Sequence, residues 1–184
     1  MITKNYFTHA KIKSFVRAGF FTRNGGVSKK ENYSLNCSLN SKDTKVNVNK
    51  NIDICLKNLK IKKKIKFISQ IHSNKIIEIN KKNMVVLIGP CLSFKNFEVS
   101  KDFKSKFISK NKKYSIFFKH KNKDKDLFNL RKLINYQFKE LGIKNIYNIN
   151  KDTFSNKRVF FSHRRESQKF RDTGRMLNII AFND

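Results

Sequence analysis

Hydrophobic positions in the first third of the chain switch from strand-like to helix-like spacing. The apolar run at 18–22 predicts a strand, and Asn24-Gly25-Gly26 predicts the turn after it, because these residue types tolerate positive φ. The stripe that follows recurs at the helical period of 3.6 residues and comprises Val48, Ile52, Cys55, Leu56 and Leu59. We therefore expect a helix here, with Ser41 or Asp43 as its N-cap.

The middle of the chain has the pattern of extended structure. Apolar and β-branched residues at 66–72 and 75–79, joined by Ser73-Asn74, are typical of a β-hairpin. Alternation along its first strand places Gln70 and His72 on the same face. A second apolar run, Met84–Gly89, predicts a buried strand that ends at Gly89-Pro90.

Helical spacing returns in the second half of the chain. Val99, Phe103 and Phe107 lie four residues apart and predict a helix at 100–107, and Gly142 is a fitting stop for a second helix at 126–141. The stripe of that second helix is Leu127, Leu130, Ile134, Phe138 and Leu141. Short strands are expected at 144–149 and 158–162. This mixture predicts an α/β (α+β) fold, a single mixed-sheet domain flanked by helices over residues 1–184.

The net charge of +29 accompanies a composition that is 39% hydrophobic, which is too apolar for a disordered chain. A nucleic-acid partner is one interpretation of such an excess. Lysine is, however, spread from Lys4 to Lys169, and no RNA-binding signature or arginine–aromatic groove is visible. The pattern favours a solvated lysine surface, and nucleic acid remains a partner only through non-specific charge.

Cysteine usage and hydropathy indicate the compartment. Three cysteines, an odd number whose spacing matches no zinc pair, argue against a disulfide framework and favour a reducing environment. The N-terminus has no continuous apolar stretch of the signal-peptide kind, and no run of 18 apolar residues exists. We therefore expect a cytoplasmic protein that has no membrane partner.

The stretch Phe160–Arg175 departs from the lysine habit of the chain. Its arginines offer a planar fork for phosphate or carboxylate that lysine cannot copy. An anion site and a surface turn with intramolecular Arg–Glu pairs are both open interpretations. His72 alone is equally open, since a single histidine on a strand is more often hydrogen-bonded than a ligand, and a catalytic zinc needs three protein ligands.

Six segments, taken in order, resemble the polyphenol-oxidase/laccase-like domain family, whose members are described as purine nucleoside phosphorylases with adenosine deaminase and methylthioadenosine phosphorylase activity. They are FFTRNGGVSKKENYSLN (20–36), VNVNKN (46–51), SQIHSNKI (69–76), IGPCLSFKNFEV (88–99), KELGIKNI (139–146) and FFSHRRESQKFRDTGR (160–175). The resemblance covers nearly the whole chain. It implies purine nucleoside and phosphate as substrates.

The resemblance also implies a metal site of two histidines and one cysteine, with zinc expected rather than copper. His72, in the Gln-x-His stretch, corresponds to the first ligand and is the candidate catalytic residue. In such a site zinc lowers the pKa of bound water or orients phosphate. Asn36, Arg164 and Arg165 are the candidates for binding substrate.

This chain departs from the family where the other two ligands should be. Only 16 residues separate His72 from Gly89, and neither an Ala-Asp-Cys nor a His-Ala-Gly-Trp-Arg-Gly stretch is among them. Asp152 stands where the family usually has cysteine, and His163 where it usually has tyrosine. The resemblance thus predicts a domain shortened in the middle, between about 80 and 84. Loss of central strands should leave strand edges and apolar faces uncovered.

Three functions follow from these observations. The chain is a zinc-dependent phosphorylase or deaminase of purine nucleosides, a catalytically inactive truncated relative, or a basic nucleic-acid-binding protein. The six segments favour the first function, the missing ligands the second and the net charge of +29 the third.

Overall fold

Strands from both ends of the chain meet in one antiparallel sheet of the computed structural model, which describes residues 5–12, 14–62, 66, 84–167 and 173–182. The central strand β2 (Val16–Phe21) lies between β1 (Tyr6–Phe7) and β8 (Asn178–Phe182). The strand expected at 18–22 is confirmed with an earlier start. Its partner β8 was not expected from the sequence, because that segment is short and carries no turn signal.

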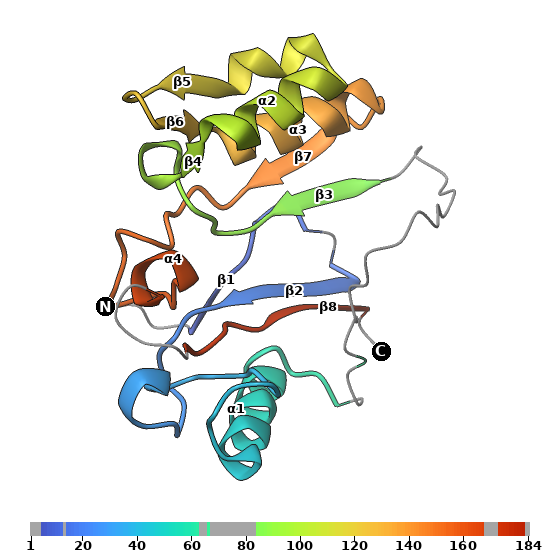
Figure 1. Cartoon of the computed structure of the whole chain (residues 1–184). Coiled ribbons are helices and arrows are strands. Elements are labelled where there is room, and N and C mark those ends of the chain that lie inside the picture. The colour runs from blue at the N-terminus through green and yellow to red at the C-terminus, as the bar shows by residue number, and fades with distance from the viewer. Residues whose placement is uncertain (1–4, 13, 63–65, 67–83, 168–172, 183–184) are drawn as a thin grey trace.

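The helix α1 (Lys45–Asn58) packs its apolar stripe against this sheet (Figure 1). The cluster comprises Phe21, Leu35, Cys37, Val48, Ile52, Cys55, Leu59 and Ile179. The stripe is confirmed, but neither Ser41 nor Asp43 is the cap. Thr44 holds that position, and its side-chain oxygen accepts a hydrogen bond from the Asn47 N–H at 3.2 Å. Asp43 instead accepts the Thr44 N–H at 2.8 Å.

A parallel pair of strands forms the second sheet. β3 (Val85–Ile88) pairs in register with β7 (Asn145–Asn148), and the strands expected at 84–89 and 144–149 are confirmed. α3 (Leu130–Glu140) comes directly before β7 and ends at Gly142, whose φ is +78°. The N–H groups of Gly142 and Ile143 bind the carbonyls of Lys139 and Phe138, the Schellman arrangement that favours glycine.

The third sheet has the order β4-β6-β5 and packs against α2 (Lys101–Lys110) and α3. Its strands are β4 (Glu98–Ser100), β5 (Phe118–His120) and β6 (Lys125–Phe128). The expected helix at 100–107 is confirmed as α2. The helix expected at 126–141 is wrong at its start, because residues 125–128 are strand β6 and Asn129 caps α3 by accepting the Lys132 N–H at 3.0 Å.

The C-terminal region contains α4 (His163–Glu166), and short 3-10 turns lie at Lys30–Asn32, Phe94–Asn96 and Lys112–Phe117. The strand expected at 158–162 is wrong, since these residues form turns and irregular chain with Phe160 and Phe161 buried. Apart from residue 66, the hairpin expected at 66–79 lies outside the described residues. Within the described part, no helix has the length and apolar character needed to cross a membrane.

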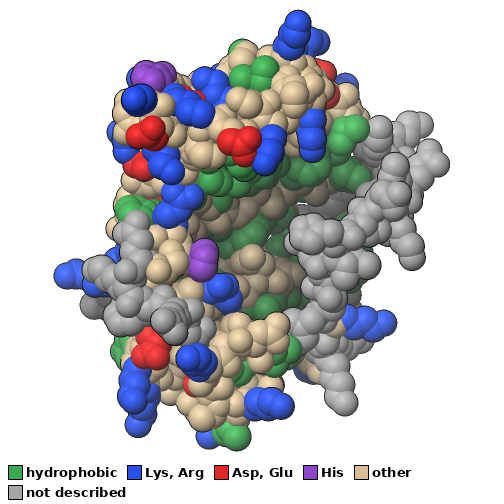
Figure 2. Space-filling model, in the orientation of Figure 1, with side chains coloured by type: hydrophobic (Ala, Val, Ile, Leu, Met, Phe, Trp, Pro, Cys, Tyr) green, Lys and Arg blue, Asp and Glu red, His purple; other side chains and the backbone are tan. Residues whose placement is uncertain are grey.

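The strands and helices together confirm the mixed α+β class, with the described strands distributed over three small sheets. Figure 1 shows the β1-β2-β8 sheet and α1 at one end of the molecule, the β4-β6-β5 sheet with α2 and α3 at the other, and the β3–β7 pair between them. The space-filling view shows hydrophobic side chains gathered along the hollow between these two ends (Figure 2).

Candidate functional site

The Gly-Gly turn closes over a buried asparagine of α1. Gly25 has a φ of +84°, and a Cβ on Gly26 would lie 2.3 Å from the Ser34 carbonyl oxygen and 2.5 Å from Asn51 Oδ1. Asn51 is fully buried and accepts the Val27 N–H at 2.8 Å. Its Nδ2 donates to the Ser34 carbonyl at 3.2 Å. The same Nδ2 also donates to Ser28 Oγ and to the Asn36 carbonyl, at 2.8 Å each. Only glycine fits at position 26 while this network is intact.

Asn36 is the site candidate at the centre of this network. Its Nδ2 donates to Ser41 Oγ at 2.8 Å and to Asp43 Oδ2 at 3.1 Å. Its Oδ1 accepts the N–H groups of Ser38 and Arg175, at 3.0 Å each. Both donors and both acceptor positions of the amide are therefore occupied within the chain. The side chain acts as a positioning residue that holds the C-terminal segment against the Gly-Gly loop.

Arg165 forms an intramolecular Arg–Glu pair, which was one of the two interpretations of this arginine-rich stretch, the other being an anion site. Its Nε contacts Glu166 Oε1 at 2.7 Å, and the two side chains are only 12% and 14% exposed. Its Nη1 donates to the carbonyls of Thr153 at 2.9 Å and Phe154 at 2.6 Å, and its Nη2 to that of Phe160 at 2.6 Å. The guanidinium thus clamps the loop before α4.

The neighbouring Arg164 is directed to a different element. Its Nη1 donates to the Glu98 carbonyl at 3.1 Å, and its guanidinium lies 5.8 Å from the centre of the Phe97 ring. The structure therefore does not bring Arg164 and Arg165 together as a two-arginine anion clamp. The third candidate, Asn36, has no hydrogen bond to either of them among those described.

A second polar cluster joins the segment after β3 to the segment after β7. Arg131 donates Nη2 to the Gly89 carbonyl at 3.2 Å and to Cys91 Sγ at 3.1 Å. Burial raises the pKa of the Cys91 thiol despite the nearby Arg131 charge. Because the thiolate is the nucleophilic form, this environment disfavours nucleophilic attack by Cys91.

Asp152 lies beside Cys91, to which its backbone forms a parallel bridge. Its carboxylate accepts the N–H groups of Ser93 at 3.1 Å and Phe154 at 3.0 Å, and Asn96 Nδ2 at 2.6 Å. Burial opposes ionisation, but these and the Ser155 hydrogen bonds prevail and lower the pKa of Asp152 to about 2. The carboxylate anchors two loops rather than a metal ion.

The described histidines are also separated from one another. His9 stacks on the Tyr147 ring with centroids 4.5 Å apart, and His120 lies near Asp126 on β6. His163 is the exposed first residue of α4. Over the described ranges, no group of three or more His, Cys, Asp or Glu side chains could hold a metal ion. His72, the ligand implied by resemblance, lies outside those ranges.

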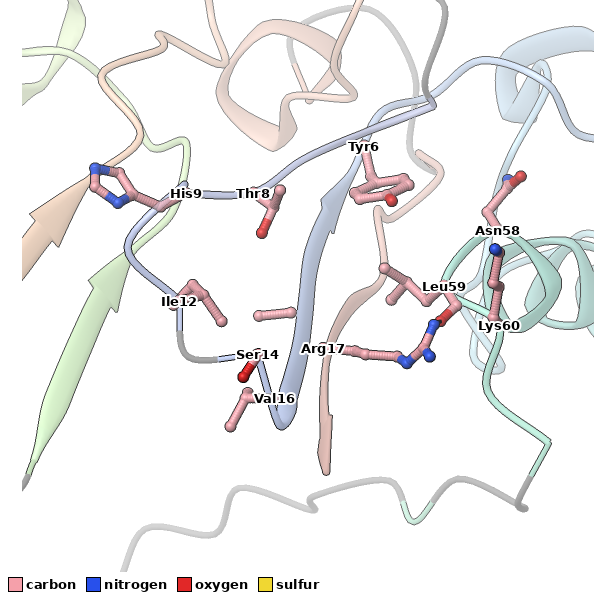
Figure 3. A pocket seen from close by; sticks show the side chains of 11 residues that line it. Tyr6, Thr8, His9, Ile12, Ser14, Val16, Arg17, Asn58, Leu59 and Lys60 are labelled. Atoms are coloured by element: carbon pink, nitrogen blue, oxygen red, sulfur yellow. Dashed lines mark hydrogen bonds between the residues drawn. The ribbon is translucent and has the colours of Figure 1, made fainter. Parts of the chain in front are cut away.

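Two adjoining cavities lie beside β2. The first, of about 370 Å³, lies between the N-terminal segment and the end of α1, where Tyr6, His9, Arg17 and Lys60 line it (Figure 3). Arg17 donates Nη1 to the Leu59 carbonyl at 2.7 Å. Cavities of this size accommodate small organic ligands, and the mixed lining offers aromatic and cationic contacts.

The second cavity, of about 460 Å³, is mainly apolar and lies between β2, β8 and β3. Phe20 and Leu87 are among its lining residues. At its edge Ile180 and Phe182 of β8 are 77% and 78% exposed, which is unusual for large apolar side chains on adjacent positions of one face. These two side chains leave an apolar patch at this sheet edge, whereas the uncovered faces expected from the sequence concerned the strands at 66–79 and 84–89.

Asn51 and Arg131 are the interacting residues that the sequence patterns did not single out. Asn51 lies three residues after Val48, on the buried face of α1, so a polar residue inside an apolar stripe was the available signal. Arg131 follows the first residue of α3 and carried no such signal.

Comparison with known proteins finds a family match over most of the chain and curated relatives that match 50% and 59% of it. The sequence model of the family described as multi-copper polyphenol oxidoreductase laccase matches residues 17–84 and 78–183. A purine nucleoside phosphorylase of Rickettsia conorii is 35% identical over 92 residues, which are 50% of this chain and 38% of the relative. One of Haemophilus influenzae is 33% identical over 110 residues, which are 59% of this chain and 43% of the relative. The matched part spans about two fifths of these relatives.

Solved structures show the same fold. The Neisseria meningitidis protein NMB0706 has a TM-score of 0.75 and 16% identity, and the comparison covers 98% of this chain and 100% of that one. The hypothetical protein YfiH of Bacillus licheniformis has a TM-score of 0.77 and 17% identity over 91% of this chain and 93% of that one. With the family match over most of its length, the chain belongs to the multi-copper polyphenol oxidoreductase laccase family.

Proposed function

We propose that this chain is a purine nucleoside phosphorylase-type protein with an incomplete zinc centre, a relative that has lost catalysis. The names of the relatives from Rickettsia conorii and Haemophilus influenzae support purine nucleoside and phosphate as its ligand class. The family model matches the chain in two segments, 17–84 and 78–183, which overlap at 78–84. This overlap coincides with the window in which the sequence lacks the Cys- and His-containing segment. Free cysteines at 37, 55 and 91 fit a cytoplasmic location.

The set of donor residues carries this proposal. A zinc site of the expected type needs one cysteine and two histidines, and the chain has three cysteines in all. Cys37 and Cys55 face each other inside the core of the first sheet, and the Cys91 thiol contacts Arg131. Among the described residues, no group of three or more His, Cys, Asp or Glu side chains could hold a metal ion, which supports an incomplete zinc centre.

Turnover tests the proposal. The purified chain, supplied with zinc, inosine or adenosine, and phosphate, should release no free base above the buffer rate. The Haemophilus influenzae relative, prepared and assayed in parallel, is the positive control. Phosphate-dependent release of base by this chain, abolished in the His72→Ala variant, would overturn the loss of catalysis and favour an active enzyme.

Restoring the missing segment tests whether the absent Cys and His are the reason for the loss of zinc binding. Inserting the relative's segment that contains the Cys and the second His between 80 and 84 should restore zinc binding. The same graft with its Cys replaced by Ser is the matched control and should bind zinc at least tenfold more weakly, since metal ligands are not interchangeable with hydroxyls. A folded graft that binds no zinc would show that more than the missing ligands prevents metal binding.

A further inference from the structure

Two cysteines that are distant in sequence meet in the core of the first sheet. Cys37 lies in the loop after the Gly-Gly turn and Cys55 lies on α1, and their sulfur atoms are 3.8 Å apart. Cys37 is 6% exposed and Cys55 is fully buried. The remaining cysteine, Cys91, contacts Arg131 of α3 and belongs to neither described core cluster.

The backbone around the two thiols is already held at close range. One helical turn before Cys55, Asn51 donates Nδ2 to the carbonyl of Asn36, the residue before Cys37, at 2.8 Å. The Cys37 N–H donates to the Arg175 carbonyl at 3.0 Å. A disulfide needs its sulfurs about 2.05 Å apart. Because the loop and helix are tied together beside the pair, the remaining approach of the sulfurs requires side-chain rotation and a small backbone shift.

We propose that Cys37 and Cys55 form an oxidisable dithiol, which a small-molecule disulfide such as glutathione disulfide converts into an intramolecular cross-link. One cysteine thiolate attacks a sulfur of glutathione disulfide, forms a mixed disulfide and releases one glutathione thiolate. The second cysteine then attacks the protein sulfur of that mixed disulfide and displaces the second glutathione. The protein loses two electrons and two protons, and glutathione disulfide is reduced to two glutathione molecules.

Burial sets the conditions for this reaction. The Cys37 thiol and burial raise the pKa of Cys55. Cys37 lies on the loop and is the more exposed of the two side chains, so the first attack is assigned to it. Attack requires local opening of the loop at 34–38, which lies between the exposed side chains of Tyr33 and Leu39. The cross-link would fix this loop, and Asn36 with it, to α1. This inference is independent of the proposed nucleoside chemistry.

The test uses the full chain carrying Cys91→Ser, so that only the two core thiols remain. After incubation with glutathione disulfide, the intact mass should fall by about 2 Da with no glutathione adduct. Trypsin cuts after Lys42, Lys45 and Lys50, which lie between the two cysteines, so a non-reduced digest should contain one linked peptide that reduction separates. The oxidised protein should melt roughly 5–10 °C above the reduced one.

A matched control is the double variant Cys91→Ser, Cys55→Ala, in which the cross-link cannot form. It should show either no change or one glutathione adduct on Cys37. An unchanged mass of the Cys91→Ser protein, or an adduct on each thiol without the linked peptide, would overturn the proposal. A linked peptide accompanied by a lower melting temperature would retain the cross-link and reject its stabilising role.

Discussion

Asn51 is the residue on which the network beneath the Gly-Gly turn depends most. Replacing it by alanine removes the acceptor of the Val27 N–H and the donor that binds the carbonyls of Ser34 and Asn36. Those two carbonyls belong to buried residues, and Asn51 itself is fully buried. Val27 is 41% exposed, so water can reach its segment more easily.

The magnitude follows from the buried Asn36 carbonyl and from the other hydrogen bonds that Asn51 donates. A buried polar group left without its partner costs about 1–3 kcal/mol. The Asn36 carbonyl loses its Asn51 donor, whereas the Ser34 carbonyl keeps the Ser28 N–H at 2.9 Å. One such group, together with the lost hydrogen bonds to the Ser34 carbonyl and to Ser28 Oγ, gives an expected decrease of about 2–4 kcal/mol in the free energy of unfolding for Asn51→Ala. Asn51→Asp should also destabilise the protein, because it places an oxygen where Nδ2 now donates.

Urea unfolding followed by far-UV circular dichroism measures this change, since the chain has no tryptophan to report by fluorescence. Asn49→Ala, at an exposed position of the same helix, is the matched control and should leave the free energy of unfolding unchanged or raise it by about 0.5 kcal/mol. A decrease below about 1 kcal/mol for Asn51→Ala would refute the network's stabilising role.

Three further substitutions probe individual positions. Gly26→Ala places a Cβ 2.3 Å from the Ser34 carbonyl oxygen, so a melting temperature lower by roughly 5 °C or more is expected in a thermal scan. Lys60 closes α1 with a φ of +54°, so Lys60→Gly should raise the free energy of unfolding in urea by about 1 kcal/mol; an unchanged value would argue against strain there. The pKa of Asp152 is lowered from 3.8 to about 2, so its carboxylate stabilises the fold above about pH 4, and this stabilisation is lost as pH falls from about 4 to about 2. Asp152→Asn should flatten that part of the stability–pH curve, and an unaltered curve would contradict the assignment.

The helices were predictable from the sequence where one apolar face is buried and the ends carry local signals. The α1 stripe and the Gly142 stop were both visible, because periodicity and a left-handed C-terminal residue are local properties. The start of α3 was not, since Leu127 and Leu130 fit a helical stripe while residues 125–128 pair with β4 and β5. Pairing with these two strands, and not the local pattern, makes residues 125–128 a strand instead of the start of the helix.

The candidate site was predictable only through resemblance, because its contacts join distant residues. Asn36 and Arg175 are 139 positions apart, and Arg131 reaches Cys91 across 40. The Cys37–Cys55 pair, 18 positions apart, matched no motif and became visible only when the loop packed on α1. The arginines of the C-terminal stretch were correctly marked as unusual, but intramolecular carbonyls occupy Arg165.

Metal stoichiometry tests the incomplete zinc centre most directly. The chain is dialysed against zinc or, separately, copper at neutral pH, and bound metal is measured per folded chain beside the Haemophilus influenzae relative. The missing Cys and His predict well below one metal ion per chain, with no difference between the wild type and His72→Ala. One tightly bound zinc ion per chain that disappears in His72→Ala would contradict the proposal.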